Sequence, residues 1–208
     1  MYDIILSFIT AFLLTYFAIP SIINIAKVKK LVDLPDERRS HDEATPSLGG
    51  IGIFGGLLFS VIMWTPFNVF GDLQYVLCSL VIIFLIGAKD DILPMSPNKK
   101  ILGEIFAAVI LVFKANVKIT SLYGIFNIYD LHPVASALFS IFSILVIINA
   151  FNLIDGINGL SGSIGTLIAV TFGTWFFLVQ RIELSLVAFA LAGSLIAFLK
   201  YNYTPAKI

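Results

Sequence analysis

Residues 133–150 read PVASALFSIFSILVIINA and contain no charged side chain. This stretch is long enough to cross the hydrocarbon core of a membrane as a helix, which needs about 17–25 apolar residues. Six further apolar stretches precede or follow it along the chain. The seven predicted spans are residues 4–26, 48–64, 73–87, 101–115, 133–150, 162–179 and 184–199.

The composition of the whole chain agrees with these spans. Of 208 residues, 59% are hydrophobic and 12% are charged, whereas a soluble domain has about 45–50% apolar and about 25% charged residues. This balance excludes a soluble metabolic enzyme, a basic DNA-binding protein and a disordered tail. We therefore predict an all-α, polytopic integral membrane protein with about seven transmembrane helices, forming a single transmembrane domain over residues 1–208. The lone Cys78 provides neither a disulfide framework nor a cysteine metal site.

The basic residues predict the orientation of the chain, because cytoplasmic loops are enriched in lysine and arginine. Ten fall on one side of the predicted membrane and three on the other. The larger group marks the cytoplasm, which places the N-terminus outside and loops 27–47, 88–100 and 151–161 inside. The ten are Lys27, Lys29, Lys30, Arg38, Arg39, Lys89, Lys99, Lys100, Lys200 and Lys207; the three are Lys114, Lys118 and Arg181.

One external segment differs from the apolar spans. Residues 117–130 alternate β-branched, aromatic and polar side chains around Gly124. Such alternation around a glycine is typical of two short paired strands. We therefore expect a short β-hairpin at the outer interface.

The first cytoplasmic loop carries Arg38 and His41, followed by Gly49 and Gly50 at the start of the next span. Cationic side chains near a glycine-rich helix start can form a phosphate site, since unpaired backbone N–H groups point outward there. The alternative is that the basic residues only set the topology and contact anionic lipid. The loop alone leaves both interpretations open.

The second cytoplasmic loop begins with two adjacent carboxylates, Asp90 and Asp91, where a span leaves the membrane. Neighbouring carboxylates repel each other and are unfavourable near hydrocarbon, so a metal ion or a phosphate-handling role would account for them. In the alternative interpretation both are solvated and paired with Lys89 and Lys100.

The third cytoplasmic loop is the most informative. Asn149, Asn152 and Asp155 are spaced by three residues, which places them on one polar face of a helix. Gly156 and Gly159 follow and permit a tight turn that can close around a ligand. A helix cap would need only one of these polar groups, so we favour a functional site.

With these three loops, the chain resembles the polyprenyl-phosphate N-acetylhexosaminyl-1-phosphate transferases of bacteria, over its whole length. The Arg38 and His41 form of the first loop is similar to the branch that uses UDP-N-acetylglucosamine and undecaprenyl phosphate. The resemblance rests on Asp33, Pro35, Arg38, His41, Pro46, Gly49, Gly50, Asp90, Asp91, Lys100, Asn149, Asn152, Asp155, Gly156, Gly159 and Leu160.

The resemblance implies a multi-pass enzyme of the bacterial inner membrane with its active face toward the cytoplasm. The family reaction uses Mg²⁺, for which Mn²⁺ is an alternative: the lipid phosphate attacks the β-phosphorus of the UDP-sugar and UMP leaves. The implied partners are UDP-N-acetylhexosamine, undecaprenyl phosphate and membrane lipid, with no nucleic acid; a homodimer is left open. The implied catalytic residues are Asp90, Asp91 and Asp155, with Asp91 and Asp155 as metal ligands; the implied substrate-binding residues are Arg38, His41, Lys100, Asn149, Asn152, Gly156 and Asn158.

Two departures from the family pattern stand out. Asn158 occupies a position where many relatives have a second acid, which removes one negative charge from the metal region. Residues 203–208 are similar to the segment that runs, in the family, into a Met-Gly-Asp-x-Gly-Ser motif, which is absent here. We therefore expect the chain to be the N-terminal portion of a longer fold, with little or no transferase activity alone.

Three rival interpretations remain at this point. A transporter would place its polar residues near the bilayer midplane and not in cytoplasmic loops. An aspartate-rich prenyltransferase would explain Asp90 and Asp91 but has no place for the Asn149–Asp155 segment. A non-catalytic membrane fragment would only pack against other proteins.

Overall fold

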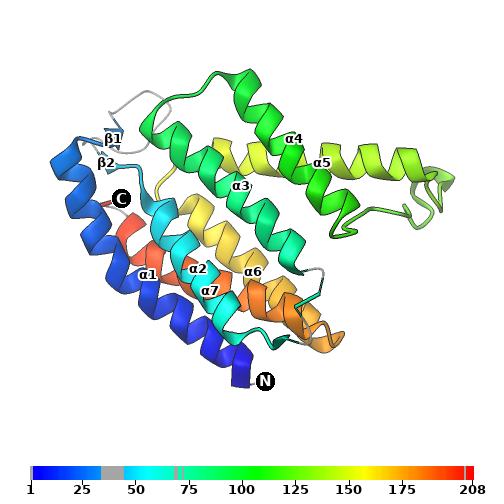
Figure 1. Cartoon of the computed structure of the whole chain (residues 1–208), viewed down its shortest axis with the longest axis horizontal. Helices are drawn as coiled ribbons and strands as arrows, with labels where there is room; N and C mark the ends of the chain where they lie inside the picture. The colour runs from blue at the N-terminus through cyan, green and yellow to red at the C-terminus, as the bar shows by residue number, and fades with distance from the viewer. Residues whose placement is uncertain (1, 34–44, 68–69, 72, 204) are drawn as a thin grey trace. The chain divides into compact units, whose positions relative to one another are not determined.

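The structure, a computed structural model, describes residues 2–33, 45–67, 70–71, 73–203 and 205–208 (Figure 1). Over these ranges an α-helix overlaps each predicted span. The helices are α1 (Tyr2–Lys29), α2 (Gly49–Trp64), α3 (Leu73–Ile92), α4 (Pro97–Phe113), α5 (Pro133–Ile154), α6 (Leu160–Leu178) and α7 (Ile182–Asn202). The prediction of an all-α membrane fold is confirmed.

Four of these helices, α1, α5, α6 and α7, are long and apolar enough to cross a membrane. The apolar helix α2 is shorter, at 16 residues, so the count of about seven spans stays a prediction. Large apolar side chains lie on the outside of the long helices: Leu138 and Phe142 of α5 are 64% and 62% exposed. Such surfaces suit lipid, because hydrocarbon solvates them as well as a protein interior would.

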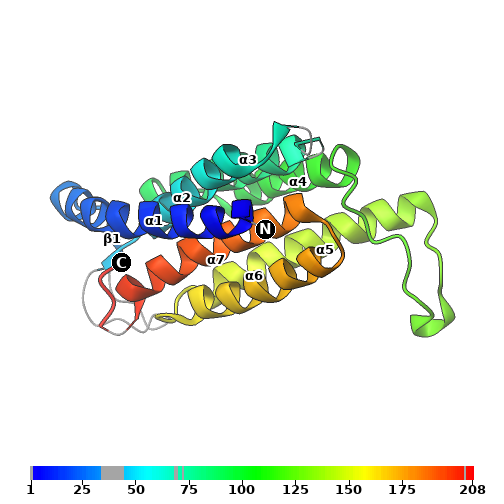
Figure 2. The ribbon, with the colours of Figure 1, turned by 90° about the horizontal axis from the view of Figure 1, so that it is seen from below.

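The chain forms two compact units, of which unit 1 comprises Met1–Phe70 and Leu153–Ile208. Its helices are α1, α2, α6 and α7. Figure 2 shows α7 between α1 and α6, and the same three helices pack pairwise in that order. Helix α2 packs against both α1 and α7. The last helix of the chain is therefore the centre of unit 1.

Small and hydroxyl-bearing residues lie at the closest contacts between the helices of unit 1. A Cβ atom on Gly193 would lie 2.3 Å from the backbone oxygen of Phe8, so only glycine lets α7 approach α1 this closely. Ser60 Oγ donates to the backbone oxygen of Ser7 at 2.5 Å, and Thr15 Oγ1 donates to that of Gly52 at 3.1 Å. Close approach of small residues with hydroxyl hydrogen bonds between helices is how membrane helices associate.

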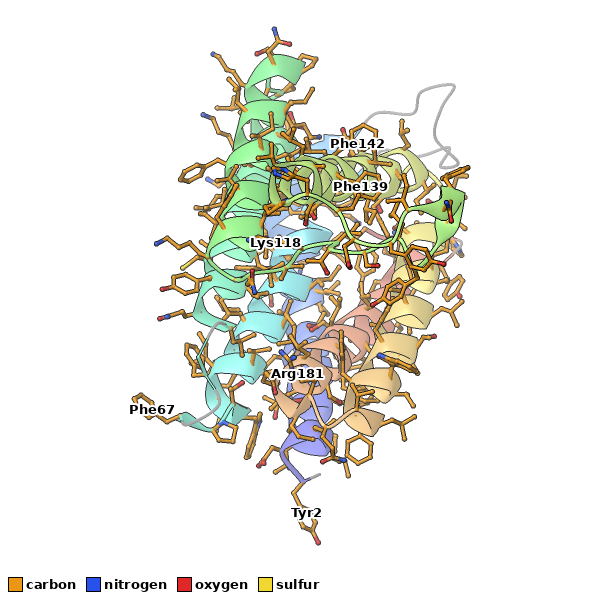
Figure 3. All side chains as sticks on the ribbon, turned by 90° about the vertical axis from the view of Figure 1, so that its right-hand side faces the viewer. Tyr2, Phe67, Lys118, Phe139, Phe142 and Arg181 are labelled. Carbon is orange, nitrogen blue, oxygen red and sulfur yellow. The ribbon has the colours of Figure 1, made fainter. Side chains whose placement is uncertain are left out.

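Helices α1 and α7 of unit 1 run parallel, with Ser7 beside Leu186 near their starts and Tyr16 beside Lys200 nearer their ends, and α2 and α6 run in the opposite direction. At one end, Trp64 Nε1 donates to Thr10 Oγ1 at 3.0 Å, and Figure 3 shows Tyr2, Phe67 and Arg181 toward this end. At the opposite end, the start of α2 faces the end of α7, where a Cβ on Gly49 would lie 2.6 Å from the Phe198 ring. These directions are what the predicted orientation requires, and the start of α6 lies at this second end as well, where a Cβ on Gly162 would lie 2.7 Å from Leu199.

Two very short strands lie between α1 and α2. Strands β1 (Val32–Asp33) and β2 (Thr45–Pro46) pair antiparallel, with Asp33 opposite Thr45. The pairing brings together the two ends of the first predicted cytoplasmic loop, whose residues 34–44 lie outside the described part of the chain.

Unit 2 comprises Gly71–Asn152 and contains α3, α4 and most of α5. Helices α3 and α4 pack against each other. Pro97 is the first residue of α4. Proline has no backbone N–H, and because the N–H groups of a first helical turn have no partner within the helix, this costs no hydrogen bond. Helix α5 is tied to the segment after α4: Ile119 N donates to Ser140 Oγ at 2.8 Å, and Ser136 Oγ donates to Ile119 O at 2.7 Å. Side-chain hydrogen bonds thus hold the elements of this unit.

The expected β-hairpin over residues 117–130 is wrong. The chain does reverse there, but pairing is limited to one isolated bridge between Ser121 and Asp130, and a 3₁₀ turn, η2 (Ile125–Asn127), forms the tip. The backbone has positive φ at Tyr123, Gly124, Phe126 and Asn127. Residues in this left-handed region coil the chain instead of extending it, so strand pairing cannot continue.

Candidate functional site

The predicted site residues divide between the two units. Unit 2 contains one group and unit 1 the other, and both groups lie at helix ends. Arg38 and His41 fall outside the described residues. Unit 2 carries Asp90, Asp91, Lys100, Asn149 and Asn152; unit 1 carries Asp155, Gly156 and Asn158.

Asp90 lies in the last turn of α3 and forms an ion pair with the start of α4. Lys100 Nζ donates to Asp90 Oδ2 at 2.9 Å, and Met95 N donates to Asp90 Oδ1 at 2.8 Å. The hydrogen bond from Lys100 lowers the pKa of the Asp90 carboxyl, against the opposing effect of desolvation and with further lowering by Met95 N–H. Asp90 is therefore a carboxylate at neutral pH, and it holds Lys100 in place.

Asp91 follows Asp90 in the same helical turn, and its side chain is exposed. A helix C-terminus carries partial negative charge, so two carboxylates there are unfavourable for the helix itself. Lys89 lies in the same turn, and a basic residue there favours the helix end.

Asn149 lies in α5, and its amide is held by two acceptors. Its Nδ2 atom donates to Glu104 Oε2 at 2.8 Å and to the backbone oxygen of Leu145 at 2.9 Å. Asn152, one turn further along α5, is exposed. The two predicted amides therefore differ: one is fixed by its neighbours, and the other is accessible.

Glu104 was not among the predicted site residues. It lies in the middle of α4 and is only 2% exposed. The sequence does contain a signal for it, because it is a lone acid within the predicted span of residues 101–115, and an ionisable residue inside a membrane span indicates a functional site.

Asp155 is the first residue after α5, and it opens a tight turn that leads into α6. The hydroxyl of Ser161 in the first turn of α6 donates to Asp155 Oδ1. Gly159, just before α6, has φ of +75°, a backbone conformation that glycine adopts without strain. Gly156 and Asn158 lie within this turn, and both are partly buried.

The end of α7 holds this turn, which the sequence analysis did not foresee. Asn202 Oδ1 accepts a hydrogen bond from Gly159 N at 2.8 Å, and Asn202 Nδ2 donates to Ile208 O at 2.7 Å. The Tyr203 ring covers Gly159 and leaves no space for a Cβ atom there, while its hydroxyl lies 2.9 Å from Ser163 Oγ. These residues, which we call the α7 clamp (Asn202, Tyr203 and Ile208), fix the turn that presents Asp155.

The described residues contain no cluster of three or more histidine, cysteine, aspartate or glutamate side chains that could hold a metal ion. Mg²⁺ does not need such a cluster, because it is usually bound by one or two carboxylates together with substrate phosphates and water. Asp91 in unit 2 and Asp155 in unit 1 each have an exposed carboxylate, the kind of oxygen donor that this mode uses.

Comparison with known proteins identifies a family match over most of the chain. Residues 73–208 match the profile of glycosyl transferase family 4. This range contains every described site residue named above.

Curated relatives share a common name, undecaprenyl-phosphate alpha-N-acetylglucosaminyl 1-phosphate transferase. The protein from Pasteurella multocida (strain Pm70) is 30% identical over 121 residues, which is 58% of this chain and 32% of that relative. The protein from Salmonella typhi is 30% identical over 96 residues, 46% of this chain and 26% of that relative. The protein from Escherichia coli O157:H7 is 29% identical over 103 residues, 50% and 28% respectively. The matched stretches thus span about a third or less of the relatives' length.

Proposed function

The chain belongs to glycosyl transferase family 4, and we propose that it serves transfer of an N-acetylhexosamine 1-phosphate, specifically GlcNAc-1-phosphate, from UDP-GlcNAc to undecaprenyl phosphate. The reaction forms a bond between an oxygen of the lipid phosphate and the β-phosphorus of the UDP-sugar. The bond from that phosphorus to the bridging oxygen breaks, and UMP leaves. The observation that carries the proposal is the family match over residues 73–208, which includes Asp90, Asp91 and Asp155.

The residues suit a reaction between two anions. Phosphoryl transfer needs mostly positioning and neutralisation of charge. Lys100, held by Asp90 at 2.9 Å, provides a fixed cation for phosphate oxygens, and Arg38 and His41 are proposed for the same task. A phosphate monoester has a second pKa near 6, so the lipid nucleophile is largely dianionic at neutral pH and needs no strong base.

Mg²⁺ is the proposed cofactor, with Mn²⁺ as the substitute. Asp91 and Asp155 would hold it through carboxylate oxygens, the donors that Mg²⁺ prefers. When bound, the ion neutralises charge on the phosphates. Asn149, Asn152 and Asn158 are proposed to bind polar groups of the sugar nucleotide, and Gly156 lets the backbone approach it.

The proposed location is the bacterial inner membrane, with the site on the cytoplasmic face. The excess of lysine and arginine in loops 27–47 and 88–100 supports this orientation. The directions of the unit 1 helices, with α1 and α7 running one way and α2 and α6 the other, are consistent with it. A lipid phosphate and a dissolved sugar nucleotide meet only at a membrane surface.

The test measures UMP release in membranes that contain the product of the complete open reading frame. Release from UDP-GlcNAc should require both undecaprenyl phosphate and Mg²⁺. Asp155→Asn should lower the rate by about 100-fold or more, because it removes a charge from the proposed metal site. Asp130→Asn, on the predicted outer face, is the matched control and should leave the rate unchanged. Release without the lipid, or an unchanged rate for Asp155→Asn, would contradict the proposal.

A further inference from the structure

Glu104 is a buried acid for which the proposed reaction gives no role. It lies in α4 among apolar residues, 2% exposed, and its helix neighbours Ala107 and Ala108 are almost fully buried as well. An acid in such surroundings is unfavourable unless a hydrogen-bond donor compensates it. The donor that compensates Glu104 in the structure is the amide of Asn149, at 2.8 Å.

This contact fixes the orientation of the Asn149 amide. An asparagine amide has one oxygen and one NH₂ group, and neighbours decide which of the two faces them. Glu104 Oε2 and the backbone oxygen of Leu145 are both acceptors and both lie within 2.9 Å of Nδ2. The reversed amide would place its oxygen against two acceptors, so only one orientation is compatible with them. Both N–H groups of Asn149 are thereby used, and Oδ1 is left for other partners.

We infer that Glu104 is a positioning residue, which holds the Asn149 amide so that Oδ1 is presented as an acceptor to the bound substrates. This inference rests on the proposed function. The group that Oδ1 meets is electropositive: either a hydroxyl or N–H donor of the sugar nucleotide, or a divalent cation with its water. Glu104 itself contacts neither substrate.

The alternative role for the pair is adhesion between α4 and α5, which cross in Figure 1. A purely adhesive contact would act through stability alone. Its loss would lower the amount of folded protein and would leave kcat/KM of the folded fraction unchanged. A positioning role predicts a different result, because kcat/KM of the folded fraction then falls, and it falls only when the Asn149 amide is present.

The experiment is a double-mutant cycle on the full-length gene product, with UMP release as the readout. Glu104→Met removes the acceptor but keeps the length of the side chain, and kcat/KM should fall about 10- to 100-fold, as expected when a buried hydrogen-bond donor loses its acceptor. Glu104→Gln retains a carbonyl acceptor and should lose less than about 3-fold. In the Asn149→Ala background, Glu104→Met should cause no further loss beyond about 2-fold.

Val112→Ala is the matched control for packing, because Val112 is fully buried in the same helix. It should lower thermal stability without changing kcat/KM of the folded fraction.

A rise in the KM for UDP-GlcNAc in Glu104→Met would assign the group at Oδ1 to the sugar nucleotide, and a rise in the half-saturating Mg²⁺ concentration would assign it to the cation. Equal losses from Glu104→Met with and without Asn149 would overturn the inference.

A second readout does not depend on activity. Selective ¹⁵N labelling of asparagine gives a side-chain NH₂ signal for Asn149, identified by its absence in Asn149→Ala. That signal should shift and exchange faster with water in Glu104→Met but not in Val112→Ala. An unchanged signal would refute the positioning role, whereas a shifted signal in a protein that releases no UMP would refute only the proposed function.

Discussion

The helices within unit 1 and the elements within unit 2 are held together by different kinds of contact. In unit 1, helices approach so closely that Gly56 and Gly193 have no space for a methyl group. In unit 2, hydrogen bonds of polar side chains join the elements. Lys100 of α4 donates to Asp90 of α3, Asn149 of α5 donates to Glu104 of α4, and Ser140 of α5 accepts from the segment after α4. Close helix packing therefore stabilises unit 1, whereas unit 2 owes part of its arrangement to Asp90, Lys100 and Asn149, which are also proposed to act in the reaction.

The difference has a direct consequence for mutagenesis. Substitutions at the close helix contacts of unit 1 should act on stability, through steric contact between backbones. Substitutions of polar groups in unit 2 should act on geometry and charge, with little change in stability. The expected losses of stability range from about 3 kcal/mol at a helix contact of unit 1 to less than about 1 kcal/mol at an ion pair of unit 2.

The largest effect is expected for Gly56→Ala in α2. The new Cβ would lie 2.2 Å from Thr15 Oγ1 and 2.8 Å from the backbone oxygen of Ala11. The Thr15 side chain can rotate but the Ala11 carbonyl cannot, so α1 and α2 must separate. We expect a loss of about 3 kcal/mol in the free energy of unfolding, the upper part of the range for overpacked cores. Unfolding in mixed micelles with increasing SDS measures it.

Gly55→Ala is the control, one residue away in the same helix. A Cβ there meets no atom within 4 Å, so the substitution should be neutral or raise stability by up to about 1 kcal/mol, because alanine is the better helix former. Similar losses for the two variants would show that close helix approach is not what stabilises unit 1.

An intermediate effect is expected for Asn202→Ala in the α7 clamp. The variant leaves Gly159 N–H without its acceptor and Ile208 O without its donor. We expect a loss of about 1–2 kcal/mol, together with faster hydrogen exchange of the turn from residue 156 to 163. Asn202→Asp keeps the acceptor for Gly159 and should preserve slow exchange there. Equal exchange in the wild-type protein and Asn202→Ala would contradict a clamping role.

The smallest effect on stability is expected for Lys100→Met in unit 2. The Asp90–Lys100 pair is partly exposed, and such pairs contribute about 0.2–1 kcal/mol. Because Lys100 lowers the pKa of Asp90 in the folded state, the contribution is complete above the ordinary pKa of aspartate and is lost as the pH falls through the lowered value. The stability difference from wild type should therefore vanish in acid.

Lys99→Met is the control for the pH experiment, since it removes the same charge one residue away from an exposed position. Its stability difference should not follow the titration of Asp90. A difference for Lys100→Met that stays constant down to acid would show that the ion pair does not contribute.

Hydropathy predicted the helices well because lipid imposes a simple length and polarity rule. It placed their ends less well. Helix α3 continues past the predicted end at residue 87 to Ile92, so Asp90 and Asp91 lie on its last turn, and α4 begins four residues early at Pro97. Polar residues at a membrane surface can continue a helix as readily as end it, so hydropathy alone cannot locate these boundaries.

The sequence predicted those site residues that can be recognised from their type and spacing. It did not predict residues whose role depends on hydrogen-bond partners far away in the chain. Asp90, Lys100 and Asn149 were recognised from their types and spacing. Glu104 and Asn202 were missed, because their roles depend on groups 45 and 43 residues away in the chain. The failed hairpin has a local cause, since positive φ at non-glycine residues such as Tyr123 and Phe126 does not follow from alternating side chains.

The hydrogen bond between Trp64 and Thr10 provides an optical probe for this comparison. The chain contains two tryptophans, Trp64 in α2 and Trp175 in α6, and both belong to unit 1. Trp175 is 59% exposed, whereas the Trp64 indole is anchored to α1. Fluorescence emission of Trp175→Phe therefore reports on the α1–α2 contact alone. Circular dichroism records helices in both units, so a denaturation curve followed by both signals would reveal whether the units melt together or in sequence.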